Sequence, residues 1–249
     1  MDKILSGLEV PCLLDDILIA SKSESENIAL LAKVIARLDK YGLKVQKSKC
    51  FFLKTSIEYL GHVIDENGVR SSRRNVESVL NARRPSDVSE LRSFLGLVNV
   101  HRKFLPNLSE VLHPLTNLLS GKVAWNWTSE CERSYQLVKS KLTDDNVLAH
   151  YDPEKEVILS VDASPFGLGA VICHIDDGHE RPIAFASRVL NAAETNYSQI
   201  EREGLAIIFG LQKFHYYLYG RKFTLYTDHK PLTMIFGAKA NIPVLAVSR

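Results

Sequence analysis

Short apolar runs predict strands near the start of the chain. Two apolar runs, Pro11–Leu14 and Ile17–Ala20, are interrupted only by Asp15 and Asp16. This pattern predicts two strands joined at an acidic tip. Adjacent carboxylates repel each other, so such a pair needs solvent, a cation or both. For an isolated Asp-Asp pair a solvated turn is the favoured interpretation, because Asp is a common turn residue.

Helical spacing follows directly after this tip. Four apolar residues fall on one helical face: Ile28, Leu31, Ile35 and Leu38. Ser23 and Glu26 have the spacing of a capping box, and Gly42 predicts the end of the helix. Beyond it, Leu43–Asp65 is expected to form short strands separated by basic residues.

From Ser71 to about Leu142 the pattern is helical throughout, in short pieces. Three prolines are expected to bound these pieces: Pro85, Pro106 and Pro114. Two sets of residues give helix start signals: Ser86 and Asp87 with Glu90, and Ser129 with Glu132. The polar stretch Asp144–Pro153 predicts a domain boundary.

The C-terminal part of the chain alternates in type. Strands are predicted at Val157–Asp162, Gly167–His174 and Pro182–Ser187, followed by a helix from about Thr195 to Tyr217 and a strand at Phe223–Asp228. Because crossover connections are right-handed, the last strand should return parallel to an earlier one. The expected fold class is α/β with a mixed sheet.

Three acidic residues can converge in that fold. Asp162 ends an otherwise apolar strand, where an acid costs desolvation unless it is paired, coordinated or catalytic. If the last strand lies beside the first, Asp228 and Asp162 lie at neighbouring strand ends, and Glu203 on the crossover helix can face them. Converging carboxylates suit Mg²⁺ or Mn²⁺, and a pair of such ions supports phosphodiester cleavage. The alternative is that Glu203 is a surface acid and Asp228 an ordinary turn acid.

The charge of the chain is unevenly distributed. The 249 residues are 45% hydrophobic and 24% charged, as in ordinary globular proteins, and no apolar run approaches the length of a membrane helix. The four cysteines lack metal-ligand and disulfide spacing, which predicts reduced, intracellular thiols. From Lys33 to Lys103 there are 15 Lys/Arg against 7 Asp/Glu, whereas residues 151–249 have 10 against 11. The basic region fits binding of a polyanion, although on charge alone solvated helix faces are the favoured explanation.

Seven motifs occur in an order that resembles a known polyprotein. They are LLDDILIA (Leu13–Ala20), GLKVQKSKCFF (Gly42–Phe52), YLGHVIDENGV (Tyr59–Val69), LRSFLGLVNVHRKFLPN (Leu91–Asn107), VDASPFGLGAV (Val161–Val171), NYSQIEREGLAI (Asn196–Ile207) and YTDHKPL (Tyr226–Leu232). Over essentially its whole length the chain resembles the pol polyprotein of gypsy-type LTR retrotransposons. The resemblance implies a partial reverse transcriptase palm (residues 1–70), a helical thumb or connecting region (71–150) and an incomplete ribonuclease H-like mixed sheet with a crossover helix (151–249).

The resemblance implies a polymerase site in the first region. Asp15 and Asp16 match the paired aspartates that bind the metals positioning the primer end and the incoming dNTP. Lys49 lies in a basic loop, and Tyr59–Val63 matches the hairpin that grips the primer. The residues expected to contact primer–template nucleic acid are Lys49, Tyr59, Gly61, His62, Arg73 and Arg74.

The resemblance implies a nuclease site in the last region. Asp162, Glu203 and Asp228 match three of the ribonuclease H acids that hold two Mg²⁺ (or Mn²⁺) ions and hydrolyse RNA in an RNA–DNA hybrid. Glu201 is the competing residue for the helix position. Glu203 is preferred because it stands before the apolar turn of the matching motif.

Several features depart from the family pattern. Leu13 stands where the family usually has Tyr, which predicts altered nucleotide handling, and Val100 and His101 replace a pair of tyrosines. The palm strand with the third polymerase aspartate and the fourth ribonuclease H acid are expected to be missing. We therefore expect a poor polymerase with at most feeble nuclease activity. The alternative is a catalytically dead, host-adopted or relic nucleic-acid-binding protein. The expected location is the cytoplasm, a virus-like particle or the nucleus, away from membranes.

Overall fold

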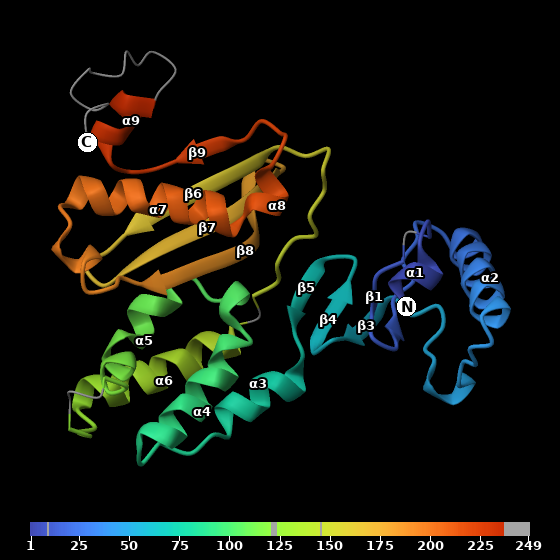
Figure 1. The fold of residues 1–249 in the computed structure, drawn as a ribbon, viewed down its shortest axis with the longest axis horizontal. Helices are drawn as coiled ribbons and strands as arrows, with labels where there is room; N and C mark the ends of the chain where they lie inside the picture. The colour runs from blue at the N-terminus through green and yellow to red at the C-terminus, as the bar shows by residue number, and fades with distance from the viewer. Residues whose placement is uncertain (9, 121–123, 145, 237–249) are drawn as a thin grey trace. The chain divides into compact units, whose positions relative to one another are not determined.

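The computed structural model describes residues 1–8, 10–120, 124–144 and 146–236 (Figure 1). Contacts within the chain divide it into two compact units, Met1–Glu66 and Asn67–Arg249. None of the helices in the described ranges combines the length and hydropathy needed to cross a membrane. The division at residues 70 and 150 stays a prediction, and residues 237–249 of the third predicted domain lie outside the described residues.

The first unit contains two hairpins and one long helix. Its elements are α1 (Asp2–Leu5), β1 (Cys12–Leu13), β2 (Asp16–Ile17), α2 (Glu24–Lys40), the 3₁₀ turn η1 (Lys47–Lys49), β3 (Ser56–Tyr59) and β4 (His62–Asp65). β1 pairs antiparallel with β2, with Leu13 opposite Asp16. The predicted strands joined at an acidic tip are therefore present. The prediction of strands throughout Leu43–Asp65 was wrong before β3, where loop and η1 occupy the chain.

The hairpin of β3 and β4 has a two-residue turn. Tyr59 lies opposite His62, and the turn residues Leu60 and Gly61 have φ values of +51° and +77°. Two successive positive φ values are typical of the turn that matches the twist of a tight hairpin. Gly61 adopts this conformation without the steric cost that a side chain would bring.

Helix α2 begins and ends close to its predicted limits. The Ser23 side chain accepts a hydrogen bond from the backbone N–H of Glu26. The Glu26 carboxylate accepts from the N–H of Lys22 rather than Ser23, so the reciprocal half of the capping box is displaced by one residue. Gly42, with a φ of +71°, closes the C-terminus as predicted.

The apolar face predicted for α2 was partly wrong. Val34 and Leu38 are buried, with Leu30 packed beside them, whereas Ile28 and Ile35 are about half exposed. The buried stripe follows the i, i+4 row that faces the small core formed with Leu5 and Val10. When a helix carries two adjacent rows of apolar residues, their spacing in the sequence does not show which row is buried.

The second unit begins with one short strand, which is followed by a helical region. Its first elements are β5 (Gly68–Ser71), α3 (Arg73–Leu80), α4 (Val88–Asn99), the 3₁₀ turn η2 (Arg102–Phe104), α5 (Leu108–Asn117) and α6 (Ser129–Thr143). Leu91, Leu105, Leu108 and Leu115 are among the fully buried side chains of this part. A single apolar cluster joins α3 to α6, so the helical region has its own core.

Two predicted helix limits in this region were wrong. Pro114 lies inside α5 instead of bounding it. Side chains of α6 contact this helix on both sides of the proline: Ser134 Oγ donates to Val111 O, and Cys131 Sγ donates to Pro114 O. The N-cap of α6 is Thr128, one residue before the predicted Ser129.

The remaining elements form a mixed sheet with a crossover helix. They are β6 (Val157–Ala163), β7 (Gly167–Asp176), β8 (His179–Val189), the 3₁₀ turn η3 (Glu194–Asn196), α7 (Gln199–Lys213), α8 (His215–Leu218), β9 (Thr224–Tyr226) and α9 (Lys230–Phe236). The strand order is β8-β7-β6-β9, and β9 is parallel to β6. The α/β class and the parallel return of the last strand are confirmed. The single helix predicted from Thr195 to Tyr217 was wrong, because the backbone leaves the helical conformation at Phe214 and divides it into α7 and α8.

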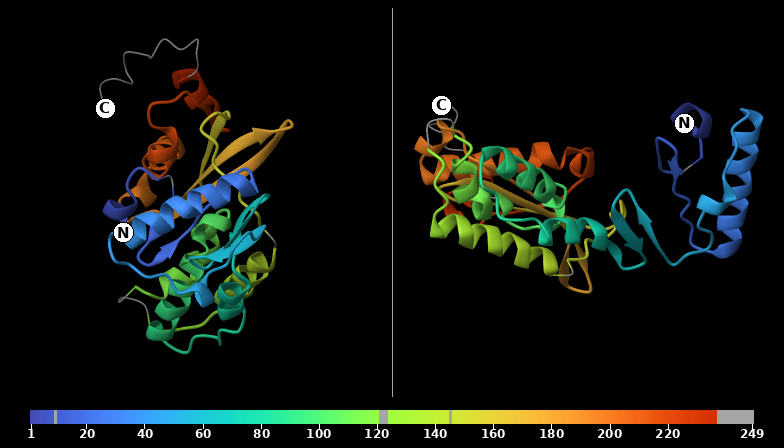
Figure 2. Two further views of the ribbon diagram at one scale, coloured as in Figure 1. Left: turned by 90° about the vertical axis from the view of Figure 1, so that its right-hand side faces the viewer. Right: turned by 90° about the horizontal axis from the view of Figure 1, so that it is seen from below.

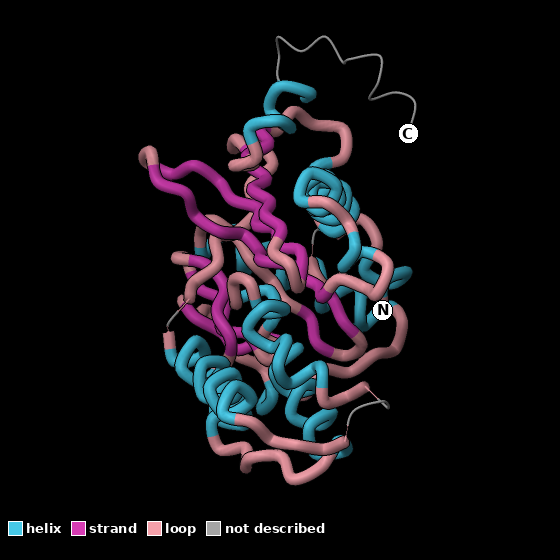
Figure 3. Tube along the Cα trace, turned by 90° about the vertical axis from the view of Figure 1, so that its left-hand side faces the viewer, coloured by secondary structure: helices cyan, strands magenta, loops and turns pink. Residues whose placement is uncertain are grey.

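Helices cover both faces of this sheet (Figures 2 and 3). α7 approaches closely because Gly210 has no side chain: a Cβ there would lie 3.0 Å from Val161 Cγ1 and 3.2 Å from Leu159 Cδ1. On the other face, the backbone N–H of Ser109 in α5 donates to Ser187 Oγ in β8 at 3.0 Å. The sheet therefore lies between the crossover helix and the helical region of the same unit.

Candidate functional site

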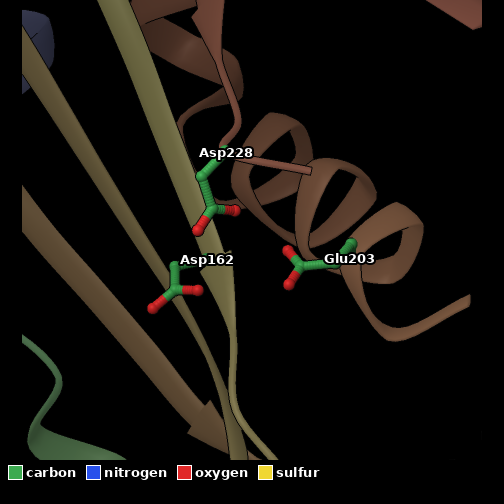
Figure 4. Close-up of side chains that lie close together, drawn as sticks. All are labelled: Asp162, Glu203 and Asp228. Atoms are coloured by element: carbon green, nitrogen blue, oxygen red, sulfur yellow. The ribbon is translucent and has the colours of Figure 1, made fainter. Parts of the chain in front are cut away.

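Three carboxylates meet at the end of the sheet where β6 stops. Each of Asp162, Glu203 and Asp228 offers a carboxylate oxygen, and these atoms all lie within 4.8 Å of one another (Figure 4). Asp162 and Asp228 are exposed, whereas Glu203 is only 3% exposed. The structure thus brings together the three acids that the sequence suggested, and their catalytic role stays a prediction.

The strand register explains why the two aspartates are neighbours. Ser160 in β6 lies opposite Tyr226 in β9. Asp162 and Asp228 each follow two residues further along these parallel strands. Carboxyl ends of adjacent parallel strands meet at one edge of the sheet, which is a frequent place for a binding site in α/β folds.

Glu203 reaches the aspartates from α7 and keeps one oxygen unpaired. Its Oε1 accepts a hydrogen bond of 2.6 Å from Gln199 Nε2, while Oε2 is buried without a hydrogen-bond partner. Burial raises the pKa of Glu203, and the nearby charges of Asp162 and Asp228 raise it further, against the lowering effects of Gln199 and His229. A buried carboxylate oxygen without a donor is costly unless something else satisfies it.

Glu201 has a different role from Glu203. Its carboxylate accepts hydrogen bonds from the backbone N–H and the hydroxyl of Ser198, at 2.9 and 2.7 Å. This reciprocal cap starts α7. Glu201 is therefore engaged at the helix end, and among these two acids Glu203 alone belongs to the carboxylate group.

The donor set fits a divalent cation with oxygen ligands. Three carboxylates at this separation repel one another unless a cation or protons neutralise them. The unpaired Oε2 of Glu203 supplies a ligand atom that no protein group uses. Hard carboxylate oxygens favour Mg²⁺, Mn²⁺ or Ca²⁺ over softer metals.

Residues of α5 also border the site, and the sequence did not suggest them. A small hollow beside Asp162 is lined by Asn107, Ser109, Glu110 and Ser164 together with the glycines at the start of β7. Asp162 lies opposite Gly169, where an added Cβ would lie 2.9 Å from Asn107 Oδ1. No local pattern signals this contact, because α5 and β7 are far apart in the sequence.

An ion pair fixes the turn that leads into α7. Arg188 donates to both carboxylate oxygens of Glu194, at 2.6 and 3.0 Å, and the N–H of Asn191 donates to the same group. The hydrogen bonds from Arg188 lower the pKa of Glu194 despite its burial. Arg188 also lies over the Phe209 ring of α7, 5.6 Å from its centroid. These contacts hold the helix that carries Glu203.

We expect Arg188→Leu to lower the free energy of unfolding by about 1–3 kcal/mol, because Glu194 loses its charged donors while remaining buried. The loss should be present at neutral pH and disappear as the pH falls through the lowered pKa of Glu194. Urea denaturation measures it. Arg133→Leu is the matched control, since Arg133 and Glu130 form an exposed pair at 4.0 Å and should change stability by less than about 0.5 kcal/mol. Equal losses in the two variants would contradict the assignment.

Asp15 lies in the turn of the β1–β2 hairpin and Asp16 is the first residue of β2, and both are exposed. The Tyr59 hydroxyl donates to the backbone oxygen of Asp16 at 3.3 Å, which connects this hairpin to the β3–β4 hairpin. Burial raises the pKa of Tyr59, as do the nearby groups Cys12 and Asp16. Within the described part of the chain, the two aspartates belong to no group of three or more candidate metal ligands.

The other predicted nucleic-acid contacts are spread over both units. Lys49 is exposed at the end of η1, Gly61 lies in the β3–β4 turn, and His62 is the first residue of β4. Arg73 and Arg74 are exposed at the start of α3, where Arg73 pairs with Glu77 at 2.9 Å. Their contacts with nucleic acid stay predictions.

Comparison with known proteins identifies two domain families. Residues 1–64 match the family described as reverse transcriptase (RNA-dependent DNA polymerase), and residues 127–225 match the RNase H-like domain found in reverse transcriptase. Asp15, Asp16, Asp162 and Glu203 lie within these ranges, and Asp228 lies just beyond the second.

Similar transposon polyproteins and solved structures agree with these families. The Tf2-3 transposon polyprotein of Schizosaccharomyces pombe is 38% identical over 226 residues, which cover 90% of this chain and 17% of that protein. The Tf2-7 polyprotein of the same organism is 37% identical over 226 residues, which again cover 90% of this chain and 17% of that protein. A foamy viral protease-reverse transcriptase dRH in complex with ds DNA matches with a TM-score of 0.80 and 28% identity, over 90% of this chain and 40% of that one. The foamy viral protease-reverse transcriptase in complex with RNA/DNA hybrid matches with a TM-score of 0.78 and 28% identity, over 90% of this chain and 31% of that one.

Proposed function

We propose that this chain carries the reverse transcriptase and RNase H-like domains of a retrotransposon polyprotein, and that its second unit hydrolyses the RNA strand of RNA–DNA hybrids. Mg²⁺ or Mn²⁺ would be held by Asp162, Glu203 and Asp228. The observation that carries this proposal is the group of three converging carboxylates, in which buried Glu203 leaves Oε2 without a protein partner.

The residues of the site have separate tasks in this proposal. The exposed carboxylates of Asp162 and Asp228 face solvent, where nucleic acid can reach them. Buried Glu203 supplies the inner ligand, held in place by α7. Bound as a pair, the metal ions supply an activated water and stabilisation of the leaving oxygen in phosphodiester cleavage. The protein contributes three carboxylates held close together, of which the Glu203 side chain is buried.

The nucleic-acid partner is inferred from charge and from the solved relatives. The foamy viral enzymes were determined with ds DNA and with an RNA/DNA hybrid. The basic stretch from Lys33 to Lys103 provides cations for a similar polyanion. We further propose that Asp15 and Asp16 belong to an RNA-directed DNA polymerase site that uses a primer–template and dNTP, with Tyr59 supporting the hairpin that carries them.

The proposal is tested by cleavage of a hybrid with labelled RNA. Wild type is expected to cleave it only with Mg²⁺ or Mn²⁺, and to leave the same RNA intact as a single strand. Asp162→Asn keeps the size of the side chain but removes a charged ligand, so it should abolish the metal-dependent part of the activity. Equal cleavage by wild type and Asp162→Asn would remove Asp162 from the mechanism. Tight hybrid binding without turnover and without metal dependence would instead favour a non-catalytic nucleic-acid-binding protein.

A further inference from the structure

Gln199 connects the helix acid of the site to the strand that carries Asp162. Its side-chain Nε2 donates to Glu203 Oε1 at 2.6 Å and to the backbone oxygen of Ala163 at 3.2 Å. Ala163 directly follows Asp162 in β6. One amide group therefore joins α7 and β6 beside the metal ligands.

The orientation of this amide follows from its partners. Gln199 Oε1 accepts a hydrogen bond of 2.9 Å from Arg202 Nη2. A guanidinium can only donate, and a backbone carbonyl can only accept. The oxygen of the amide must therefore face Arg202, and its NH₂ group must face Ala163 and Glu203. Both amide hydrogens and the amide oxygen are then used.

This arrangement divides the two oxygens of Glu203 between two tasks. Gln199 donates a hydrogen bond to Oε1. Oε2 has no hydrogen-bond partner in the protein, and the Glu203 carboxylate lies close to those of Asp162 and Asp228. A carboxylate without the first contact could rotate and exchange its two oxygens. The contact therefore fixes which oxygen is offered to a cation.

We propose that Gln199 is a positioning residue, which acts through Glu203 to preset the metal ligands. The inference rests on the proposed metal site, and it assigns to Gln199 a role that the three acids alone do not contain. Hydrogen-bond partners that orient metal ligands typically contribute about 10–100-fold in metal affinity or activity.

The chain offers a matched contact for comparison. In α6, Gln136 Nε2 donates to Glu132 Oε1 at 2.9 Å. The two residues are also four positions apart, but this contact lies on an exposed helix surface, whereas Glu203 is buried. That pair has no connection to the carboxylate group. If Gln199 and Glu203 merely form another helix surface pair, replacing either glutamine should have the same small effect.

The experiment measures Mn²⁺ binding to the full chain by isothermal titration calorimetry, without nucleic acid. Gln199→Leu should weaken Mn²⁺ binding by at least about tenfold, while Gln136→Leu should bind as wild type does. Arg202→Leu, which keeps Gln199 but frees its amide to turn over, should show a smaller loss. In hybrid cleavage, the Mn²⁺ concentration giving half-maximal rate should rise in Gln199→Leu, while KM for the hybrid stays unchanged.

The outcomes separate this inference from the proposed function. Wild-type affinity in Gln199→Leu would overturn the positioning role, provided that Asp162→Asn binds more weakly than wild type. Equal, weak Mn²⁺ binding by wild type and Asp162→Asn would overturn both the metal site and the role of Gln199. If circular dichroism shows that Gln199→Leu is unfolded, Arg202→Leu provides the test. Unchanged Mn²⁺ affinity in Arg202→Leu would contradict the inference, and weakened affinity would support it.

Discussion

Glu203→Gln is expected to abolish metal-dependent RNA cleavage while making the metal-free protein more stable. The substitution removes the inner ligand of the proposed site, and the metal's stabilisation of charge in the transition state is worth several kcal/mol, so the rate should fall by at least about 10³-fold. The amide can still accept from Gln199, and its NH₂ group can donate to Asp162 or Asp228. A repulsive contact thereby becomes a hydrogen bond, which should raise the free energy of unfolding by about 1–2 kcal/mol.

The stability difference between Glu203→Gln and wild type should depend on pH. Burial, followed by the charges of Asp162 and Asp228, raises the pKa of Glu203 in the folded protein. As pH rises, the unfolded chain therefore loses this proton first, and wild-type stability falls between the ordinary glutamate pKa and the raised folded value. The free energy of unfolding of Glu203→Gln should equal that of wild type at pH values below this window and should be higher than that of wild type above it. Urea denaturation in EDTA at both ends of the window measures the difference.

Metal addition supplies the complementary test. A cation that binds only the folded state stabilises it, so Mg²⁺ should raise the melting temperature of wild type but not of Glu203→Gln. Glu201→Gln is the matched control, because Glu201 caps α7 and is not part of the carboxylate group. It should lose some stability and retain cleavage. A Glu203→Gln variant that is less stable than wild type in EDTA at neutral pH would contradict the repulsion on which the prediction depends.

The sequence predicted strands better than helix faces, and the reason is physical. The strands β6–β8 follow from mainly apolar segments separated by turn residues, so their positions can be predicted without choosing which side is buried. On α7, however, spacing draws attention to large residues such as Ile208, which is 53% exposed. The face that meets the sheet instead carries Ala206 and Gly210, since close packing of helix on sheet requires small residues there.

The three acids could be predicted from the sequence, whereas Gln199, which contacts one of them, could not. Asp162 and Asp228 stand at the ends of predicted strands, and a motif resemblance selected Glu203 over Glu201. Gln199 was not predicted, because a polar residue in the first turn of a helix is unremarkable. Its position four residues before Glu203 was the only available signal. The contact with Ala163 arises from chain topology, which spacing does not encode.

Leu159→Ala should lower the free energy of unfolding by about 2–5 kcal/mol. Leu159 is fully buried in β6 and lies against Gly210 of α7. Its loss leaves a cavity between the strand that carries Asp162 and the helix that carries Glu203. We expect metal-dependent cleavage to fall together with stability, because both sides of the site are loosened.

Leu115→Ala provides the matched comparison and tests the predicted division near residue 150. Leu115 is equally buried, but in the separate apolar cluster of the helical region. If the two clusters open independently, hydrogen exchange should accelerate in α5 and α6 for Leu115→Ala, and in α7 and β6 for Leu159→Ala. Cleavage should survive Leu115→Ala under conditions where that variant stays folded. Equal acceleration across both clusters in both variants would show that the sheet and the helical region unfold as one body, held together by contacts such as that between Ser109 and Ser187.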